Sequence, residues 1–422
     1  MSMTSLPDAA ERTLPRGRSL PVPQRVVLFN VKYSPNLGDG LLSECLEREL
    51  GRALPGCDVV SIDLAGRRHY PLVHGRARGA VLALLERCPA SLRRLLAGAM
   101  LHLLLAFRLR AHYRRALRGA EAVVLGGGNL FTDADLNFPV KIWGALGEAS
   151  RKSVPVAVFA VGVARTWSRP AARLFGGALG RTAIVAASVR DEKSRETWSS
   201  HFRGTTAPLP DVVVDPGVLA SLHFPVALRR KGSRKIGLCV TDPLAVRYHS
   251  TRASAANLEA WYPAALQSLV AHGFEVALFT NGSPEDRGYL YRRFEEWIRR
   301  AKGPVTLSRS FDDPAALTTF VSGCDGIIGH RMHACIAAFS FGVPAVGLRW
   351  DPKLDSFFDM SGRSAHMLDP ARVSGREAGE RILAALADPF DPRPLIARAQ
   401  AQVAGLAASL QTTLAERALA RR

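Results

Sequence analysis

Two histidines and an arginine fall within the six residues 329–334, which read GHRMHA. The apolar pair Ile327-Ile328 precedes them, and the small-residue segment 334–341 predicts a helix. A helix amino end attracts anions, an arginine binds phosphate or carboxylate, and an imidazole transfers protons near neutral pH. Arg331 and His333 therefore predict anion binding joined to proton transfer. The alternative is a helix-capping loop with a solvated arginine and a core histidine. We expect His330 to be such a structural histidine.

A second arginine, Arg190, directly follows the apolar segment 184–189 and precedes Asp191. A guanidinium group at the carboxyl end of a strand is suited to clamp a carboxylate or phosphate with two hydrogen bonds. An Arg–Asp surface pair of little energetic consequence is the alternative.

Three glycines, Gly126 to Gly128, and then Asn129 follow the apolar segment 123–125. Glycine lets backbone N–H groups approach an anion closely, so Gly127, Gly128 and Asn129 are candidate anion-binding residues. The segment matches neither a Walker loop nor the GxGxxG fingerprint, and a sterically tight turn explains three glycines equally simply.

Carboxylates and amides lie at similar points of the chain. Asp39, in the segment Asn36-Leu37-Gly38-Asp39, and Asp133, just past the glycines, are each candidates for a general base or for a helix cap. Asn36 and the pair Asn281-Gly282, which is a strong turn signal, are candidate cleft-lining residues.

The elements that must position these side chains alternate between strand and helix, which predicts an α/β fold with parallel sheets. The predicted strands are 25–30, 59–64, 123–125, 156–161 and 184–189, and then 235–240, 276–280, 305–307, 327–328 and 343–348. We expect two Rossmann-like domains facing across a cleft, because 422 residues are too many for one ordinary core. The expected divisions are a disordered lead-in 1–24, an N-terminal domain 25–215, a C-terminal domain 216–395 and a terminal helix 396–422.

An insertion at 80–118 interrupts the first domain. Its segment 95–107 is almost continuously apolar and is flanked by arginines at 93, 94, 108, 110, 114, 115 and 118. It is too short to span a bilayer, which takes about 20 residues. An interfacial helix on an anionic membrane and a helix buried between domains both fit these residues.

The net charge of +19 predicts an anionic partner, which nucleic acid, an anionic membrane surface or acidic small molecules would each supply. We expect no nucleic acid, because the basic residues lack interleaved aromatic residues. The six cysteines form no CxxC pair and have no zinc spacing, so we expect no metal site and a reduced, cytoplasmic protein. If 95–107 docks on a membrane, its place is the inner face of the cytoplasmic membrane.

Taken in order, these motifs resemble the polysaccharide pyruvyl transferase family. The resemblance rests on the segments 36–39, 126–128, 188–191, 211–216, 329–334 and 342–344. It implies a fold similar to two-domain GT-B glycosyltransferases. It also implies transfer of pyruvyl from phosphoenolpyruvate to sugar hydroxyls of a cell-surface polysaccharide, or its lipid-linked precursor, as a ketal. By resemblance, Arg331 and Arg190 hold the donor, and His333 is the acid. No cofactor is implied besides phosphoenolpyruvate, the donor substrate.

Two rival functions share parts of this pattern. A GT-B nucleotide-sugar glycosyltransferase would have the same architecture, but the region before Gly342-Val343-Pro344 lacks a glutamate placed to hold a ribose. A non-catalytic protein that binds nucleic acid or membrane through its charge is the rival from another class.

Overall fold

The computed structural model describes residues 22–70, 90–228, 232–243, 255–301 and 303–420. The predicted lead-in 1–24 lies outside the described residues up to residue 21, and the predicted insertion 80–118 lies outside them up to residue 89.

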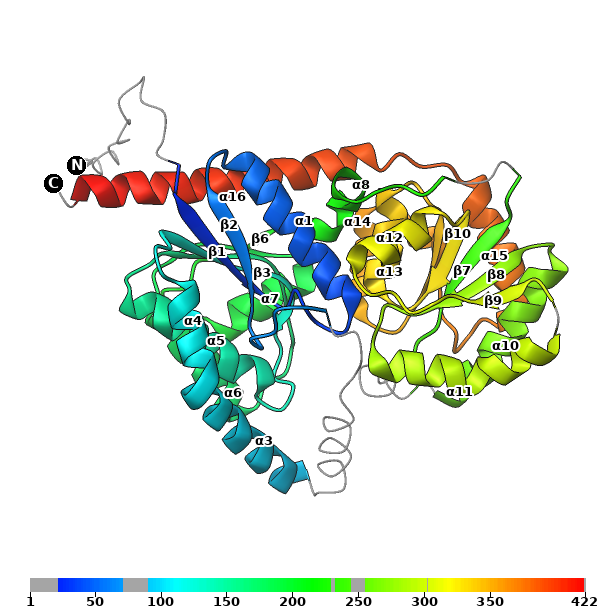
Figure 1. Cartoon of the computed structure of the whole chain (residues 1–422), viewed down its shortest axis with the longest axis horizontal. Coiled ribbons are helices and arrows are strands. Elements are labelled where there is room, and N and C mark those ends of the chain that lie inside the picture. Colours follow the sequence, from blue (N-terminus) through cyan, green and yellow to red (C-terminus); the bar gives the residue numbers. More distant parts are fainter. Residues whose placement is uncertain (1–21, 71–89, 229–231, 244–254, 302, 421–422) are drawn as a thin grey trace, which may run out of the picture.

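Two six-stranded, parallel sheets form the two halves of the molecule, as the alternation of strands and helices predicts (Figure 1). The first has the order β2-β1-β3-β4-β5-β6 and the second β12-β11-β10-β7-β8-β9. The first sheet consists of β1 (Arg25–Asn30), β2 (Asp58–Asp63), β3 (Ala122–Phe131), β4 (Val156–Val163), β5 (Ile184–Val189) and β6 (Asp211–Val212). The second consists of β7 (Lys235–Cys239), β8 (Glu275–Phe279), β9 (Val305–Leu307), β10 (Gly326–Gly329), β11 (Ala345–Leu348) and β12 (Met367–Leu368).

Helices cover both faces of each sheet, so the central strands are buried on both sides. All eight residues of β4 are buried, and their near-continuous apolar sequence is typical of a parallel strand inside an α/β domain. The helices of the first half are α1 (Leu37–Ala53), α3 (Ala90–Leu104), the π-helix η1 (Leu105–Leu109), α4 (Arg110–Ala116), α5 (Asn137–Arg151), α6 (Arg169–Gly180) and α7 (Glu192–His201).

The second half continues this pattern after a short connection. That connection holds the 3₁₀ helix η2 (Pro216–Leu219) and α8 (Ala220–His223). The helices that follow are α10 (Ala255–Ala271), α11 (Pro284–Ala301), α12 (Pro314–Ser322), α13 (Met332–Ser340), α14 (Pro352–Met360), the 3₁₀ helices η3 (Ser364–His366) and η4 (Gly375–Glu377), α15 (Ala378–Ala387) and α16 (Arg393–Ala420).

The long helix α16 crosses back from the second half to the first (Figure 1). Its Gln400 donates to Glu49 of α1 at 3.1 Å, and its Gln402 accepts from the backbone of Val214 at 2.8 Å. Its apolar residues, among them Val403 and Leu410, belong to the core that α1 and the first sheet form. The two sheets are thus tied together both by the connection at 213–235 and by this returning helix.

The glycine segment differs from the sequence prediction. Gly126 to Gly128 do not form a loop after a strand, because β3 continues through them to Phe131. Gly127 and Gly128 have φ values of +76° and +77°, and the pairing with β4 shifts register after Gly128. Only glycine adopts these angles readily, and a Cβ at Gly127 would lie 2.0 Å from Leu42 Cδ1 of α1. The glycines therefore form a strand irregularity under α1.

The described part of the insertion forms a bent helix, consisting of α3, η1 and α4, on the outside of the first domain. Leu105, Leu109 and Tyr113 are buried against that domain, whereas Leu103 and Phe107 are exposed. A helix buried between the two domains, one of the two alternatives from the sequence, is therefore wrong. No helix among the described residues is both long and apolar enough to cross a membrane.

Candidate functional site

The carboxyl ends of strands from both sheets meet at one small cavity of about 160 Å³. This is the edge at which open α/β sheets bind their ligands. The first domain contributes Asn36, Asp39, Asn129 and Arg190 to its lining, and the second contributes Asn281, Arg331, Met332, His333, Trp350, Asp351, Lys353 and Leu354. Seven of the eleven predicted site residues are thus brought together, although they come from segments far apart in the chain.

Arg331 is held in place by a buried carboxylate. Its Nε and Nη2 atoms lie 2.7 and 2.6 Å from Asp286 Oδ2, and its guanidinium lies over the ring of Trp350 at 5.2 Å. The other oxygen of Asp286 accepts from the backbone N–H of Asp242 at 2.8 Å. Burial raises the pKa of Asp286, and the charge of Arg331 opposes that rise. Nη1 of Arg331 takes part in neither contact with Asp286, so the guanidinium can also bind an anion.

His333 lies in the first turn of α13 and is almost fully buried. Its Nε2 atom lies 3.7 Å from Oδ2 of Asp215, which comes from the connection between the domains. The imidazole also packs on the start of α1, because a Cβ at Gly38 would lie 2.5 Å from His333 Nδ1. Burial alone would raise the pKa of Asp215, but His333 and then Arg190 outweigh it and lower that pKa. Asp215 therefore stays ionised near neutral pH.

Arg190 is buried on the opposite side of the cavity. Its Nε lies 3.6 Å from Asp191 Oδ2, and its Nη1 lies 3.9 Å from Asp215 Oδ2. A Cβ at Gly162 of β4 would lie 2.6 Å from Arg190 Nη2 and 2.7 Å from Asn129 Oδ1. The absence of a side chain at Gly162 therefore makes the space that these two polar groups occupy.

Several buried polar atoms around this cavity have no hydrogen-bond partner among the described residues. These atoms are Asn129 Oδ1, Arg190 Nε, Asp191 Oδ2, Asp215 Oδ2 and His333 Nε2. Buried polar groups are nearly always paired in folded proteins, so five such atoms at one place indicate a site prepared for a polar ligand.

Asp39 lies at the same cavity, in the first turn of α1. The helix is capped by Asn36, whose side-chain oxygen accepts from Gly38 N at 3.2 Å, so Asp39 is not needed as the cap. Burial raises the pKa of Asp39, while His333, Ser34, Arg67 and Arg190 oppose that rise. A carboxylate with a raised pKa is a better proton acceptor near neutral pH than an ordinary aspartate.

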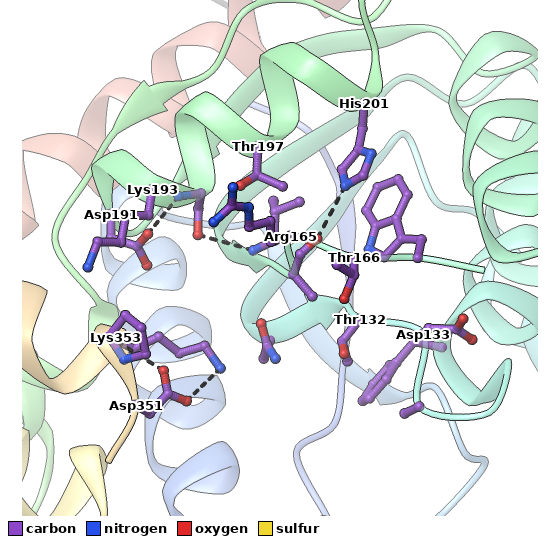
Figure 2. A pocket seen from close by; sticks show the side chains of 18 of the residues that line it. Thr132, Asp133, Arg165, Thr166, Asp191, Lys193, Thr197, His201, Asp351 and Lys353 are labelled. Atoms are coloured by element: carbon purple, nitrogen blue, oxygen red, sulfur yellow. Dashed lines mark hydrogen bonds and ion pairs between the residues drawn. The ribbon is translucent and has the colours of Figure 1, made fainter. Parts of the chain in front are cut away.

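Asp133 lies apart from this small cavity, in the wall of a larger one of about 1590 Å³. Its two carboxylate oxygens accept from the backbone of Leu136 and of Ser168, each at 2.9 Å. The two cavities share Asn36, Asp39, Asn129, Asp351 and Lys353. In Figure 2, Asp351 and Lys353 lie on one side of the larger cavity, across from Thr132 and Asp133.

The other predicted residues, Asn281, Gly282, Gly127 and Gly128, help to position the elements that form the site. Leu37 N donates to Asn281 O at 2.7 Å, and a Cβ at Gly282 would lie 2.7 Å from Pro35 O. The turn Asn281-Gly282, with Gly282 at φ +93°, therefore joins the second domain to the start of α1. Gly127 and Gly128 do not line the small cavity, but Gly128 lies next to Asp39.

Sequence reasoning assigned no role to Asp215, Asp286, Asp351 or Lys353. Lys353 pairs with Asp351 at 3.1 Å, and burial, followed by the charge of Arg190, lowers its pKa. A signal was present for two of them, since Asp215-Pro216 and Asp351-Pro352 are helix starts with a capping residue and a proline. Asp286 had no comparable signal, because an acidic residue in the first turn of a helix is common.

His330 is structural, consistent with the role assigned to it. It is fully buried, its Nδ1 lies 3.2 Å from the hydroxyl of Tyr262, and burial together with Arg331 lowers its pKa to about 3. It is therefore neutral near pH 7. The described residues also contain no group of three or more His, Cys, Asp or Glu side chains arranged to hold a metal ion.

Comparison with known proteins decides the family. Residues 36–352 match the family model described as polysaccharide pyruvyl transferase. The chain belongs to this family. Because the match covers most of the chain and every residue of the small cavity up to Asp351, the protein is a transferase of the polysaccharide pyruvyl transferase family. No curated protein matches it in sequence.

Solved structures with the same two-domain arrangement are of GT-B type. The UDP-GlcNAc 2-epimerase of Methanocaldococcus jannaschii, in complex with UDP-GlcNAc and UDP, has a TM-score of 0.50 at 12% identity, covering 86% of this chain and 92% of the epimerase. MnaA of S. aureus with UDP has a TM-score of 0.50 at 10% identity, covering 89% and 90%. The E. coli heptosyltransferase WaaC with ADP has a TM-score of 0.42 at 14% identity, covering 86% and 99%. At these identities the first two show the fold, which is GT-B-like.

Half-buried Asp39 and buried Asp215 of this pyruvyl transferase family site should affect stability in opposite directions. Asp39→Asn should raise the free energy of unfolding near pH 7 by about 0.5–2 kcal/mol, because an aspartate with a raised pKa destabilises the folded state when ionised. Asp215→Asn should lower it by about 1.5–3 kcal/mol, because a lowered pKa stabilises the folded state above the ordinary pKa of aspartate.

Urea unfolding near pH 7 and at acidic pH measures both effects. The gain from Asp39→Asn should vanish as the pH falls below the ordinary aspartate pKa, where the carboxyl is protonated in both states. The loss from Asp215→Asn should shrink as the pH falls through the lowered pKa of the folded protein. Changes of the same sign in both variants would show that the local electrostatics are misassigned.

Proposed function

We propose that this protein transfers pyruvyl from phosphoenolpyruvate to two hydroxyls of a sugar in a cell-surface polysaccharide or its lipid-linked precursor, forming a ketal. The observation that carries the proposal is that Arg190 and Arg331, from opposite domains, line the same small cavity as His333. Phosphoenolpyruvate has a phosphate and a carboxylate, which match two guanidinium groups, and a methylene carbon that needs a proton.

The donor would lie between the two arginines, with further positive charge from Lys353 and the amino end of α13. The fork of a guanidinium group binds a planar carboxylate or a phosphate with two parallel hydrogen bonds. Asn129, whose side-chain oxygen lacks a partner, lies beside Arg190 and would contact the donor or the incoming hydroxyl. Gly127 and Gly128 would act indirectly, since they let α1 and Asp39 approach β3.

In the first step, His333 as imidazolium donates its proton to the methylene carbon of phosphoenolpyruvate. The electron pair of the carbon–carbon double bond forms the new C–H bond, which leaves an oxocarbenium-like centre at the carbon that bears the phosphate. The carboxylate of Asp215 lies 3.7 Å from the imidazole and would orient the ring for this transfer. General acid catalysis of this kind contributes about 10²–10⁴-fold to the rate.

In the second step, a sugar hydroxyl attacks that centre and loses its proton to Asp39. A neighbouring hydroxyl then displaces phosphate and closes the ketal, and the phosphate leaves with the electron pair of the broken carbon–oxygen bond. Asp39 then passes the proton that it took up to His333, and the proton of the second hydroxyl leaves with phosphate, so the enzyme returns to its starting state. Asp39 is preferred as the base over Asp133, because both oxygens of Asp133 already accept backbone hydrogen bonds.

The sugar acceptor would occupy the larger cavity, which shares the lining residues Asn36, Asp39 and Asn129 with the small one. Its volume of about 1590 Å³ is in excess of what a three-carbon donor needs and suits a saccharide of more than one residue. The cavity is lined by hydroxyls, charged groups and Trp167, whose indole is stacked on His201 at 3.7 Å. We further propose that the reaction takes place at the inner face of the cytoplasmic membrane, where lipid-linked precursors are found.

One assay tests the proposal. The protein is incubated with phosphoenolpyruvate and candidate lipid-linked or nucleotide sugars, with and without EDTA, and the products are analysed for phosphate release and by mass. We expect phosphate release that depends on both substrates and an acceptor that has gained pyruvate less water. We also expect no effect of EDTA, since the arginines supply the positive charge. Release of a nucleoside diphosphate would instead show a glycosyltransferase, and rescue by Mg²⁺ after EDTA would show that a metal takes part.

A further inference from the structure

A row of large apolar side chains is exposed on one side of α3 and η1. Leu96, Met100, Leu103 and Phe107 have exposed fractions of 44%, 50%, 58% and 82%. Their spacing of four, three and four residues places them on one face of a helix. The opposite side is anchored in the first domain by Leu105 and Leu109, which are buried. The exposed row is therefore presented by a helix whose other face is fixed.

The segment that carries this row has charged side chains of a single sign. Residues 90–120 contain no aspartate or glutamate, and the arginines at 108, 114, 115 and 118, which follow the row, are all exposed. Arg114 has one acidic neighbour, Glu148 of α5, at 3.4 Å. An apolar face bordered by arginines is typical of helices that lie in the interface of an anionic bilayer. A second copy of the same face is a poorer partner, because its arginines would repel.

The position of α3 suits such a surface. Figure 1 shows α3 at the lower edge of the first domain, where it projects below α5 and α6. A Cβ at Gly98 of α3 would lie 3.4 Å from Leu136 Cδ1, so α3 contacts the loop that contains Asp133 and Asp135. Those two aspartates line the larger cavity, and the exposed helix therefore lies beside the wall of that cavity.

We propose that the exposed face of α3 and η1, with the arginines that follow it, docks the first domain on an anionic lipid bilayer. The helix lies in the plane of the interface, with Leu103 and Phe107 inserted among the lipids and Arg115 and Arg118 on the headgroups. If the proposed function also holds, docking brings the wall of the larger cavity to the membrane, where it would receive a sugar attached to a lipid carrier. The docking itself does not depend on that function.

Co-sedimentation of the full chain with phosphatidylcholine vesicles, with and without phosphatidylglycerol, tests the docking without donor or acceptor. We expect binding that requires phosphatidylglycerol and weakens with salt. Leu103→Ser combined with Phe107→Ser should lower the partition coefficient about 100-fold, because the favourable free energy of moving each apolar side chain from water into lipid is lost. Arg115→Gln combined with Arg118→Gln should lower it about 10-fold.

Leu209→Ser combined with Leu419→Ser is the matched control, because these two leucines are 79% and 61% exposed at other places. The control should bind as the unaltered protein does, and thermal melts should show that every variant is folded. Equal binding by the Leu103/Phe107 variant, or no binding by the unaltered protein, would overturn the proposal. If the unaltered protein is a dimer that does not bind vesicles, and the Leu103/Phe107 variant is a monomer, the exposed face binds a second copy of the chain instead.

Discussion

Replacing His333 with glutamine is expected to lower kcat by at least about 10²–10⁴-fold, with little change in the affinity for phosphoenolpyruvate. Glutamine fills much of the same space but cannot donate a proton to carbon. The donor should still bind, because its charged groups are matched by Arg190 and Arg331, which stay in place. Steady-state kinetics gives kcat, and calorimetric titration of the variant with phosphoenolpyruvate gives the affinity.

His330→Gln is the matched control three residues earlier. His330 is neutral near pH 7, since its pKa is about 3, and its Nδ1 contacts Tyr262 in the core. This variant should lose stability but keep the kcat of its folded fraction within a few-fold. If His333→Gln turns over normally, or if His330→Gln abolishes turnover in folded protein, the role of His333 as the acid is wrong.

Replacing Arg331 with methionine is expected to raise the KM for phosphoenolpyruvate by about 10²-fold or more. The loss of one partner of a buried, hydrogen-bonded charge pair costs 2–5 kcal/mol. Arg331 would form such a pair with an anionic group of the donor while it stays bound to Asp286. The KM of Arg331→Lys should lie between those of the unaltered protein and of Arg331→Met, because lysine keeps the positive charge but lacks the two-pronged guanidinium group. Initial rates at varied donor concentration separate KM from kcat.

A second substitution separates binding from folding. Arg331→Met leaves Asp286 buried without its partner, which by itself destabilises the protein. Asp286→Asn removes that charge, so the double variant should regain stability but not donor affinity. Donor affinity that returns with Asp286→Asn would mean that Arg331 acts only as the partner of Asp286. An unchanged KM in Arg331→Met would remove Arg331 from the donor site.

Much of the fold follows from short-range patterns in the sequence. The bounds predicted for β1, β5 and β9 agree with the structure, because each is a short apolar run that ends at a turn or cap. The two-residue strands β6 and β12 were not predicted, since two residues carry no period. The glycines after Leu125 were predicted to end β3, and the strand instead continues. Their conformation is linked to Leu42 of α1, which lies against Gly127 although it is distant in the sequence.

The site was predictable where a single residue type determines its chemistry. Arg190, Arg331 and His333 follow strands and have few structural duties at such places, so their position at the carboxyl edge was sufficient to bring them together. The roles of the carboxylates were harder to predict, because an aspartate at a helix start is most often a cap. Asp133 accepts two backbone hydrogen bonds. Asp39 is not used as a cap, because Asn36 caps α1, and its carboxylate therefore faces the cavity. Only the tertiary contacts distinguish these two.

Turnover in D₂O tests the central claim most directly. If a protein acid protonates the methylene carbon of phosphoenolpyruvate, the ketal product formed in D₂O must have one deuterium in its methyl group, held in a C–D bond that does not exchange after return to H₂O. Mass spectrometry of the purified product measures this. The account predicts an acceptor that has gained pyruvate less water, with that single deuterium, and no such product from His333→Gln on the same timescale. A product without deuterium, or one that contains a transferred sugar, would contradict it.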